Sequence, residues 1–113
     1  MSARPLLFTA AFAALLAAAG TARADETVSL TITLRDHRFD PAELRAPANT
    51  RIQLKVINED PVSEEFDSRA LKVEKVIAGK SEGIVRISSL APGRYEFIGE
   101  YHEDTAKGVL IAE

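Results

Sequence analysis

The sequence contains no cysteine among its 113 residues, and it has only 2 histidines and 1 methionine. Exported domains of this size often gain stability from disulfides, which this chain cannot form. The absence of cysteine also excludes a thiolate nucleophile and every metal site that depends on thiolate ligands. Stability therefore has to come from an apolar core or from a bound ion.

An excess of basic residues is also missing, as are a glycine-rich phosphate loop and any helix-length amphipathic segment. From residue 25 onward there are 12 basic and 17 acidic residues, a net charge of about −5. A nucleic-acid partner needs a basic face, so we expect no such partner. The acidic balance is compatible with cation binding, and equally with an ordinary solubilising charge.

The N-terminal segment has the pattern of a secretory signal peptide. Arg4 supplies a positive start, residues 6–20 are apolar and alanine-rich, and residues 22–24 read Ala-Arg-Ala. Small residues at this spacing precede signal-peptidase cleavage sites. The apolar run is shorter than the roughly 20 residues of a membrane span, although an uncleaved anchor is the alternative. We expect a signal peptide over residues 1–24, export to the periplasm, and one domain over residues 25–113.

The exported part is predicted to be all-β. Apolar and polar residues alternate in four segments, at 27–34, 50–57, 84–88 and 94–98, and residues 108–112 are expected to form a short final strand. A period of two is typical of half-buried strands, and the turn residues between the segments favour a sandwich or barrel. The chain length favours a two-sheet Greek-key sandwich of about seven strands.

Two aromatic residues are expected to be structural. Phe39 lies in the break at 36–41 and is a candidate core residue. Tyr95 follows a Pro-Gly turn and is expected to fill the corner of the Greek key, with its hydroxyl bonded to the backbone.

Three motifs resemble those of cupredoxins. In chain order they are Phe39-x-Pro41 with Leu44 and Pro47-Ala48-Asn49-Thr50; Asn58-Glu59-Asp60 ahead of Glu64-Glu65-Phe66; and Pro92-Gly93-Arg94-Tyr95-Glu96-Phe97 followed by Gly99-x-x-His102 and Lys107-Gly108. The resemblance implies a cupredoxin-like Greek-key β-sandwich.

The sequence departs from blue-copper cupredoxins at the metal ligands. Gly99 stands where that family has its thiolate, Lys107 where it has the axial methionine, and Glu64 where it has the first histidine. His102 alone keeps its place. A blue-copper centre needs a thiolate and two imidazoles, so type 1 copper is excluded.

The variant resembles the cupredoxin-like proteins of bacterial periplasmic iron uptake, namely FtrB-like proteins and the N-terminal domain of EfeO-like proteins. The segments that carry this resemblance are 65–68, 71–79 and 99–104. The resemblance implies a periplasmic protein that assists ferrous iron oxidation, or delivery of the iron to an inner-membrane iron permease. The sequence leaves open whether oxidation takes place in this protein or in its partner.

Acidic residues surround one histidine near the C-terminus. Glu100, Glu103 and Asp104 lie within two residues of His102. Carboxylates and one imidazole suit iron, manganese, copper(II) or zinc better than copper(I). The alternative is a solvated acidic loop with a surface histidine.

A second acidic group lies some forty positions earlier, at Glu64, Glu65 and Asp67. Side chains alternate along a strand, so Glu64 is expected to share the core-facing side of Phe66. A carboxylate there is costly to bury unless it is paired or metal-bound. Exposed glutamates paired with Arg69 or Lys72 are the alternative.

The predicted metal ligands are therefore Glu64, Glu65, Asp67, Glu100, His102 and Glu103, holding iron, copper(II) or both. Whether Glu64 or Glu65 faces the site stays open. His37 is interpreted as a surface-loop histidine, and a second-site ligand with Asp36 or Asp40 is the alternative. A non-catalytic binding module and a copper(II) carrier are the competing functions.

Overall fold

A computed structural model describes residues 26–113. The predicted signal peptide and the first residue of the expected domain lie outside this range. Nine strands and one short 3₁₀ helix, η1, form the described part. The strands are β1 (Thr27–Arg35), β2 (Arg38–Asp40), β3 (Glu43–Ala46), β4 (Arg51–Asn58), β5 (Glu64–Ser68), β6 (Val73–Ile77), β7 (Ser81–Ile87), β8 (Gly93–Gly99) and β9 (Lys107–Ala112), with η1 (Glu100–His102) between the last two.

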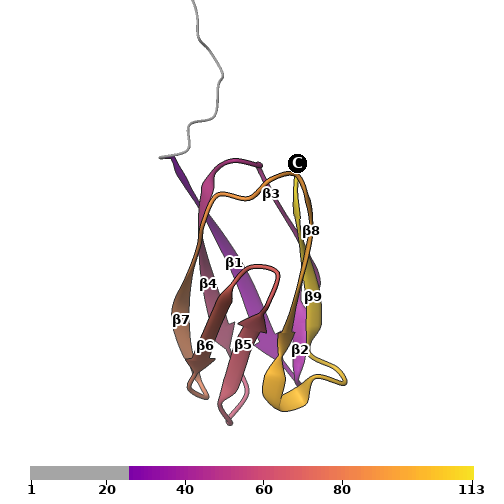
Figure 1. Ribbon diagram of the computed structural model, residues 1–113. Coiled ribbons are helices and arrows are strands. Elements are labelled where there is room, and N and C mark those ends of the chain that lie inside the picture. The colour runs from indigo at the N-terminus through magenta and orange to yellow at the C-terminus, as the bar shows by residue number, and fades with distance from the viewer. Residues whose placement is uncertain (1–25) are drawn as a thin grey trace, which may run out of the picture.

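The strands form two mixed sheets packed as a sandwich (Figure 1). One sheet has the order β2-β1-β4-β7 and the other the order β3-β9-β8-β5-β6. The pairs β1–β4 and β3–β9 are parallel, and the remaining pairs are antiparallel. The all-β prediction is confirmed. The count exceeds about seven because the break at 36–41 contains the short strand β2, and residues 43–46 form the short strand β3.

The alternating segments place their apolar side chains between the sheets. In β4, Ile52, Leu54 and Val56 are at most 2% exposed, while the residues between them are half-buried or exposed. Burial of an aliphatic side chain stabilises a fold by about 1.5–3 kcal/mol, so a slip of one residue would lose several such contributions. The core therefore fixes the register that brings the strand ends together.

Three phenylalanines fill the core beneath one end of the sandwich. The rings of Phe66 and Phe97 stack at a centroid distance of 4.9 Å, and Phe39 meets both rings edge-on at 5.9 and 5.2 Å. Phe39 is 6% exposed, which confirms its predicted place in the core. This packing ties β2 to β5 and β8.

The Greek-key corner also follows the prediction. The Tyr95 hydroxyl donates a hydrogen bond of 2.7 Å to the carbonyl of Ala91. Figure 1 shows that η1 and the loop between β4 and β5 lie at the end of the sandwich away from the C-terminus. Within residues 26–113, no helix is long and apolar enough to span a membrane.

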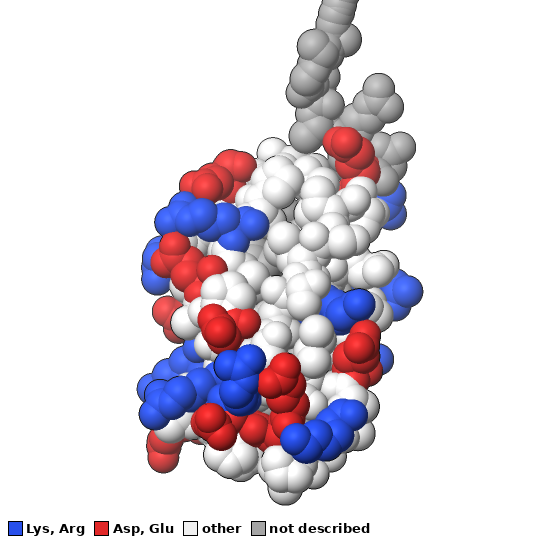
Figure 2. Space-filling view, turned by 180° about the vertical axis from the view of Figure 1, so that it is seen from behind, with Lys and Arg blue, Asp and Glu red and all other residues white. Residues whose placement is uncertain are grey.

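The outer surface mixes both signs of charge. On the face seen in Figure 2, Lys and Arg side chains are interspersed with Asp and Glu. That face therefore offers no surface of a single sign.

Candidate metal site

Glu64 begins β5 and is buried at the end of the sandwich. Its side chain lies on the same side of the strand as Phe66, as the alternation predicted, and the residue is 2% exposed. One carboxylate oxygen, Oε2, accepts the N–H of Tyr101 at 2.7 Å and the N–H of Glu65 at 3.2 Å. The other oxygen, Oε1, lies 2.6 Å from Nδ1 of His102. Hydrogen bonds therefore compensate the burial of this carboxylate.

His102 ends η1, in the loop that joins β8 to β9. Its carbonyl accepts the N–H groups of Thr105 and Ala106 at 3.1 and 2.8 Å, and the N–H of Gly99 donates to the carbonyl of Ala106 at 2.9 Å. These bonds close the loop and direct the imidazole towards Glu64. The side chain of His102 is 30% exposed, so one part of the ring faces the buried carboxylate while another part reaches solvent.

Gly99 leaves the space that the Glu64 carboxylate occupies. A Cβ at this position would lie 2.7 Å from Cδ of Glu64 and 2.8 Å from Cβ of Ala106. Contacts this short require the neighbouring atoms to move. The buried carboxylate of Glu64 therefore requires a glycine at position 99, where the blue-copper motif has its thiolate.

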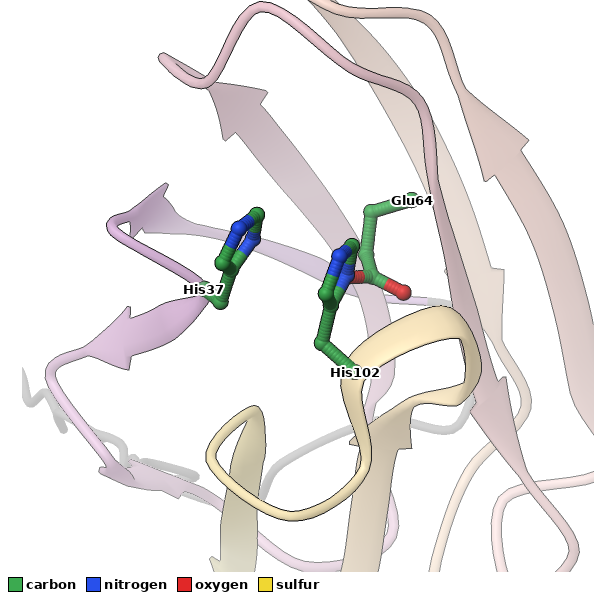
Figure 3. Close-up of side chains that lie close together, drawn as sticks. All are labelled: His37, Glu64 and His102. Atoms are coloured by element: carbon green, nitrogen blue, oxygen red, sulfur yellow. The ribbon is translucent and has the colours of Figure 1, made fainter.

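His37 is the third potential ligand, a role that the sequence offered only as the alternative to a surface-loop histidine. Its ring stacks on that of His102, with 3.6 Å between centroids and 10° between planes (Figure 3). Nδ1 of His37 is buried and has no hydrogen-bond partner, although Oδ2 of Asp60 lies 3.4 Å away. Figure 3 shows His37 reaching the site from the β1–β2 hairpin, whereas His102 comes from η1.

Asp60 is a second buried carboxylate at this end of the sandwich. It accepts the N–H groups of Asp36 and His37 at 2.7 and 2.9 Å. Burial alone raises the pKa of Asp60, but these two donors and the nearby His37 and Lys80 outweigh it and hold the pKa below its ordinary value. Asp60 therefore stays ionised beside the turn that carries His37.

The four other predicted ligands lie outside this group. Glu65 and Glu100 meet Glu74 in a separate acidic cluster, and Asp67 lies next to Glu100. Burial and the neighbouring Glu74 raise the pKa of Glu65, and a hydrogen bond with Asp67 and the charge of Glu65 raise that of Glu100. Glu103 follows η1 and is exposed. The structure thus brings Glu64 and His102 together and groups neither with these four.

The donor set consists of two imidazoles and one carboxylate. His37, Glu64 and His102 each offer an atom within 4.8 Å of the others. The buried nitrogen of His37 without a partner is unusual, since buried polar atoms are normally hydrogen-bonded. Imidazole and carboxylate together suit copper(II), iron and zinc. These residues therefore fit a transition-metal ion but not a type 1 copper centre.

Comparison with known proteins agrees with this fold. Residues 6–112 match the family model of the cupredoxin-like domain. An uncharacterized protein of Rickettsia prowazekii (strain Madrid E) is 37% identical over 87 residues, which are 77% of this chain and 70% of that protein.

Solved structures of similar fold include the two that follow, whose identities are too low to indicate function. A heme-copper terminal oxidase dimer contains a chain with a TM-score of 0.66 and 20% identity, over 79% of the present chain. The present chain spans 65% of that oxidase chain. Auracyanin A, a blue copper protein from the bacterium Chloroflexus aurantiacus, gives a TM-score of 0.65 and 16% identity, over 77% of the present chain and 99% of auracyanin.

Proposed function

This chain belongs to the cupredoxin-like domain family, and we propose that it binds a transition-metal ion through His37, Glu64 and His102. One observation carries the proposal. Three side chains of metal-ligating type come from three separate segments of the chain and meet at one end of the sandwich. Both histidines of the sequence are among them. A purely structural role does not require the two imidazoles of a protein to stack beside a buried carboxylate.

Copper(II) is the ion that this donor set should bind most tightly. For nitrogen and oxygen ligands, affinity among divalent first-row ions rises from manganese and iron to a maximum at copper(II), and falls again at zinc. The family resemblance to copper proteins supports the same ion. With a carboxylate in place of a thiolate, the site is suited to copper(II) rather than copper(I).

Titration calorimetry of residues 25–113 with copper(II), zinc and anaerobic iron(II) tests the proposal. We expect one ion per chain, with copper(II) bound most tightly. His102→Ala should weaken binding by about 100-fold or more, since losing a residue that merely orients a ligand already costs 10–100-fold. Glu103→Gln is the matched control, one residue away and outside the group. Equal affinities for His102→Ala and the wild type would refute the site.

Within this role, we propose that the protein works in the periplasm as a partner of an iron permease. Support comes from the sequence resemblance to FtrB-like proteins and to the N-terminal domain of EfeO-like proteins. Carboxylate ligands favour ferric over ferrous iron, so the site would assist the oxidation of ferrous iron. Each ferrous ion then gives up one electron, which we assign to a partner protein or to dioxygen.

Two measurements separate this role from that of a copper(II) carrier. The wild type should consume ferrous iron faster than buffer does, and His102→Ala should not. A carrier would bind copper(II) without changing that rate, and the two imidazoles are the feature that favours it. Export is tested by mass spectrometry of the protein recovered from the periplasm. The measured mass should be that of a chain that begins at Asp25.

A further inference from the structure

His37 reaches the metal site from a turn of only two residues. Asp36 and His37 join β1 to β2 and have φ values of 53° and 57°. Two-residue hairpin turns with positive φ at both positions favour Asn, Asp or Gly at the first position and Gly at the second. Asp36 fits this preference, but His37 stands where glycine is favoured. A left-handed conformation costs such a residue about 1–2 kcal/mol, so this turn needs support from outside itself.

Asp60 provides that support from the loop between β4 and β5. Its Oδ1 accepts the N–H of Asp36 and its Oδ2 accepts the N–H of His37. The carboxylate is 6% exposed, which makes these charge-assisted bonds stronger than they would be in water. Both residues of the strained turn are thereby tied to one buried side chain.

Asp60 is itself fixed to the core. Its N–H donates to Oδ1 of Asn58 at 3.0 Å, and Asn58 is 1% exposed. The Asn58 amide in turn donates to the carbonyls of Val62 at 2.9 Å and Ile77 at 3.2 Å. A continuous set of hydrogen bonds thus connects the end of β6 with the backbone of His37.

We infer that Asp60 is a positioning residue that places His37 for metal ligation, an inference that rests on the proposed function. Asp60 accepts a hydrogen bond from the backbone N–H of His37, and its Oδ2 also lies 3.4 Å from Nδ1 of the ring. The ring of His102 is bonded to Glu64. The two rings are nearly parallel, so their lone pairs do not converge, and one ring has to tilt to share an ion.

Copper(II) titration of Asp60→Asn tests the inference. The substitution removes the charge and places an amide against two N–H donors, so it should loosen the turn. We expect the affinity for copper(II) to fall by about 10–100-fold, the usual effect of losing a residue that orients a ligand. Asp40→Asn is the matched control, because Asp40 is an exposed residue of β2. An unchanged affinity in Asp60→Asn would overturn the inference.

A second variant separates positioning from turn stability. Adding Asp36→Gly to Asp60→Asn lowers the backbone cost of positive φ at position 36, because glycine adopts that conformation freely. We expect the melting temperature to recover while the affinity for copper(II) stays low, because the turn is still not tied to residue 60. If affinity returns together with the melting temperature, Asp60 acts only by stabilising the turn and the inference is wrong.

Proton NMR of the metal-free protein adds a readout that does not depend on metal binding. Stacked rings shift each other's protons upfield, so the ring protons of His37 and His102 should be displaced in the wild type. This displacement should be lost in Asp60→Asn and retained in Asp40→Asn; if Asp60→Asn keeps it, Asp60 does not position His37. If the wild type binds no copper but Asp60→Asn still abolishes the displacement, the proposed function is wrong and the positioning of His37 stands.

Discussion

Replacing Gly99 by alanine should strongly destabilise the protein. The backbone of Gly99, with φ −95° and ψ 106°, is extended and accepts any residue, so the cost comes from space alone. The new methyl group would lie 2.7 Å from Cδ and 3.0 Å from Cγ of Glu64, and 2.8 Å from Cβ of Ala106. Glu64 cannot move without weakening its bond to His102.

The expected loss follows from two contributions. Overpacking of a closely packed interior costs about 1–3 kcal/mol. A weakened hydrogen bond to a buried charged group costs about 1.5–3 kcal/mol. Since the two effects share one displacement, we expect a total of about 2–4 kcal/mol. For a domain of this size, that lowers the melting temperature by roughly 10–30 °C.

Urea unfolding and thermal melting measure this change. Gly83→Ala is the matched control, since its Cβ would meet the flexible ends of Ile77 and Lys75 at 3.0 and 3.4 Å, and it should change stability by less than about 1 kcal/mol. In a Glu64→Ala background, the loss of stability caused by Gly99→Ala should be smaller by about 1 kcal/mol or more, because part of the clash is gone. If Gly99→Ala and Gly83→Ala change stability equally, Gly99 does not lie close to Glu64. The same holds if the effects of Gly99→Ala and Glu64→Ala simply add.

Three further predictions concern stability. Glu100→Gln should raise stability at neutral pH, because the raised pKa of Glu100 means that its ionised form opposes folding. This gain in stability should shrink as the pH falls to about 4.3, and the control Glu103→Gln should show no gain. The lowered pKa of Asp60 contributes stability above about pH 4 that is lost on further acidification, so acid unfolding of Asp60→Asn, followed by circular dichroism, should depend less on pH below that point. Tyr95→Phe should lower the free energy of unfolding in urea by about 1 kcal/mol, because the bond to Ala91 is lost; no change would mean that this bond is not stabilising.

The strands were predictable where one face of a strand is buried. Alternation over 27–34 and 50–57 corresponds to β1 and β4, whose inward residues form the core. The strands β2 and β3 have only 3 and 4 residues, too few to show a period of two. Their strand character comes from pairing with β1 and β9, which a local pattern does not contain.

The site was predictable in part for the same reason. Glu64 was expected beside Phe66 because side chains alternate along a strand, and the cupredoxin spacing placed His102 nearby. The same alternation puts Glu65 and Asp67 on the opposite face, where Glu65 joins Glu74 instead. Charge and spacing alone cannot tell which acidic residues a strand turns inward.

The sequence offered a ligand role for His37 only as the alternative, because its position depends on contacts between distant segments. The turn that carries it has Asp36 at its first position but lacks the glycine that normally follows in a two-residue hairpin. What holds it is Asp60, more than twenty residues later. Residues 58–60 resemble a family motif, but the hydrogen bonds that Asp60 accepts from the turn are visible only in three dimensions.

Anomalous diffraction from crystals grown with copper(II), recorded at the copper edge, tests the central claim most directly. The account predicts one peak per chain about 2.0–2.1 Å from a nitrogen of His37 and a nitrogen of His102, the usual distance between imidazole and a metal ion. A peak among Glu65, Glu74 and Glu100 instead, or no peak near either histidine, would contradict it.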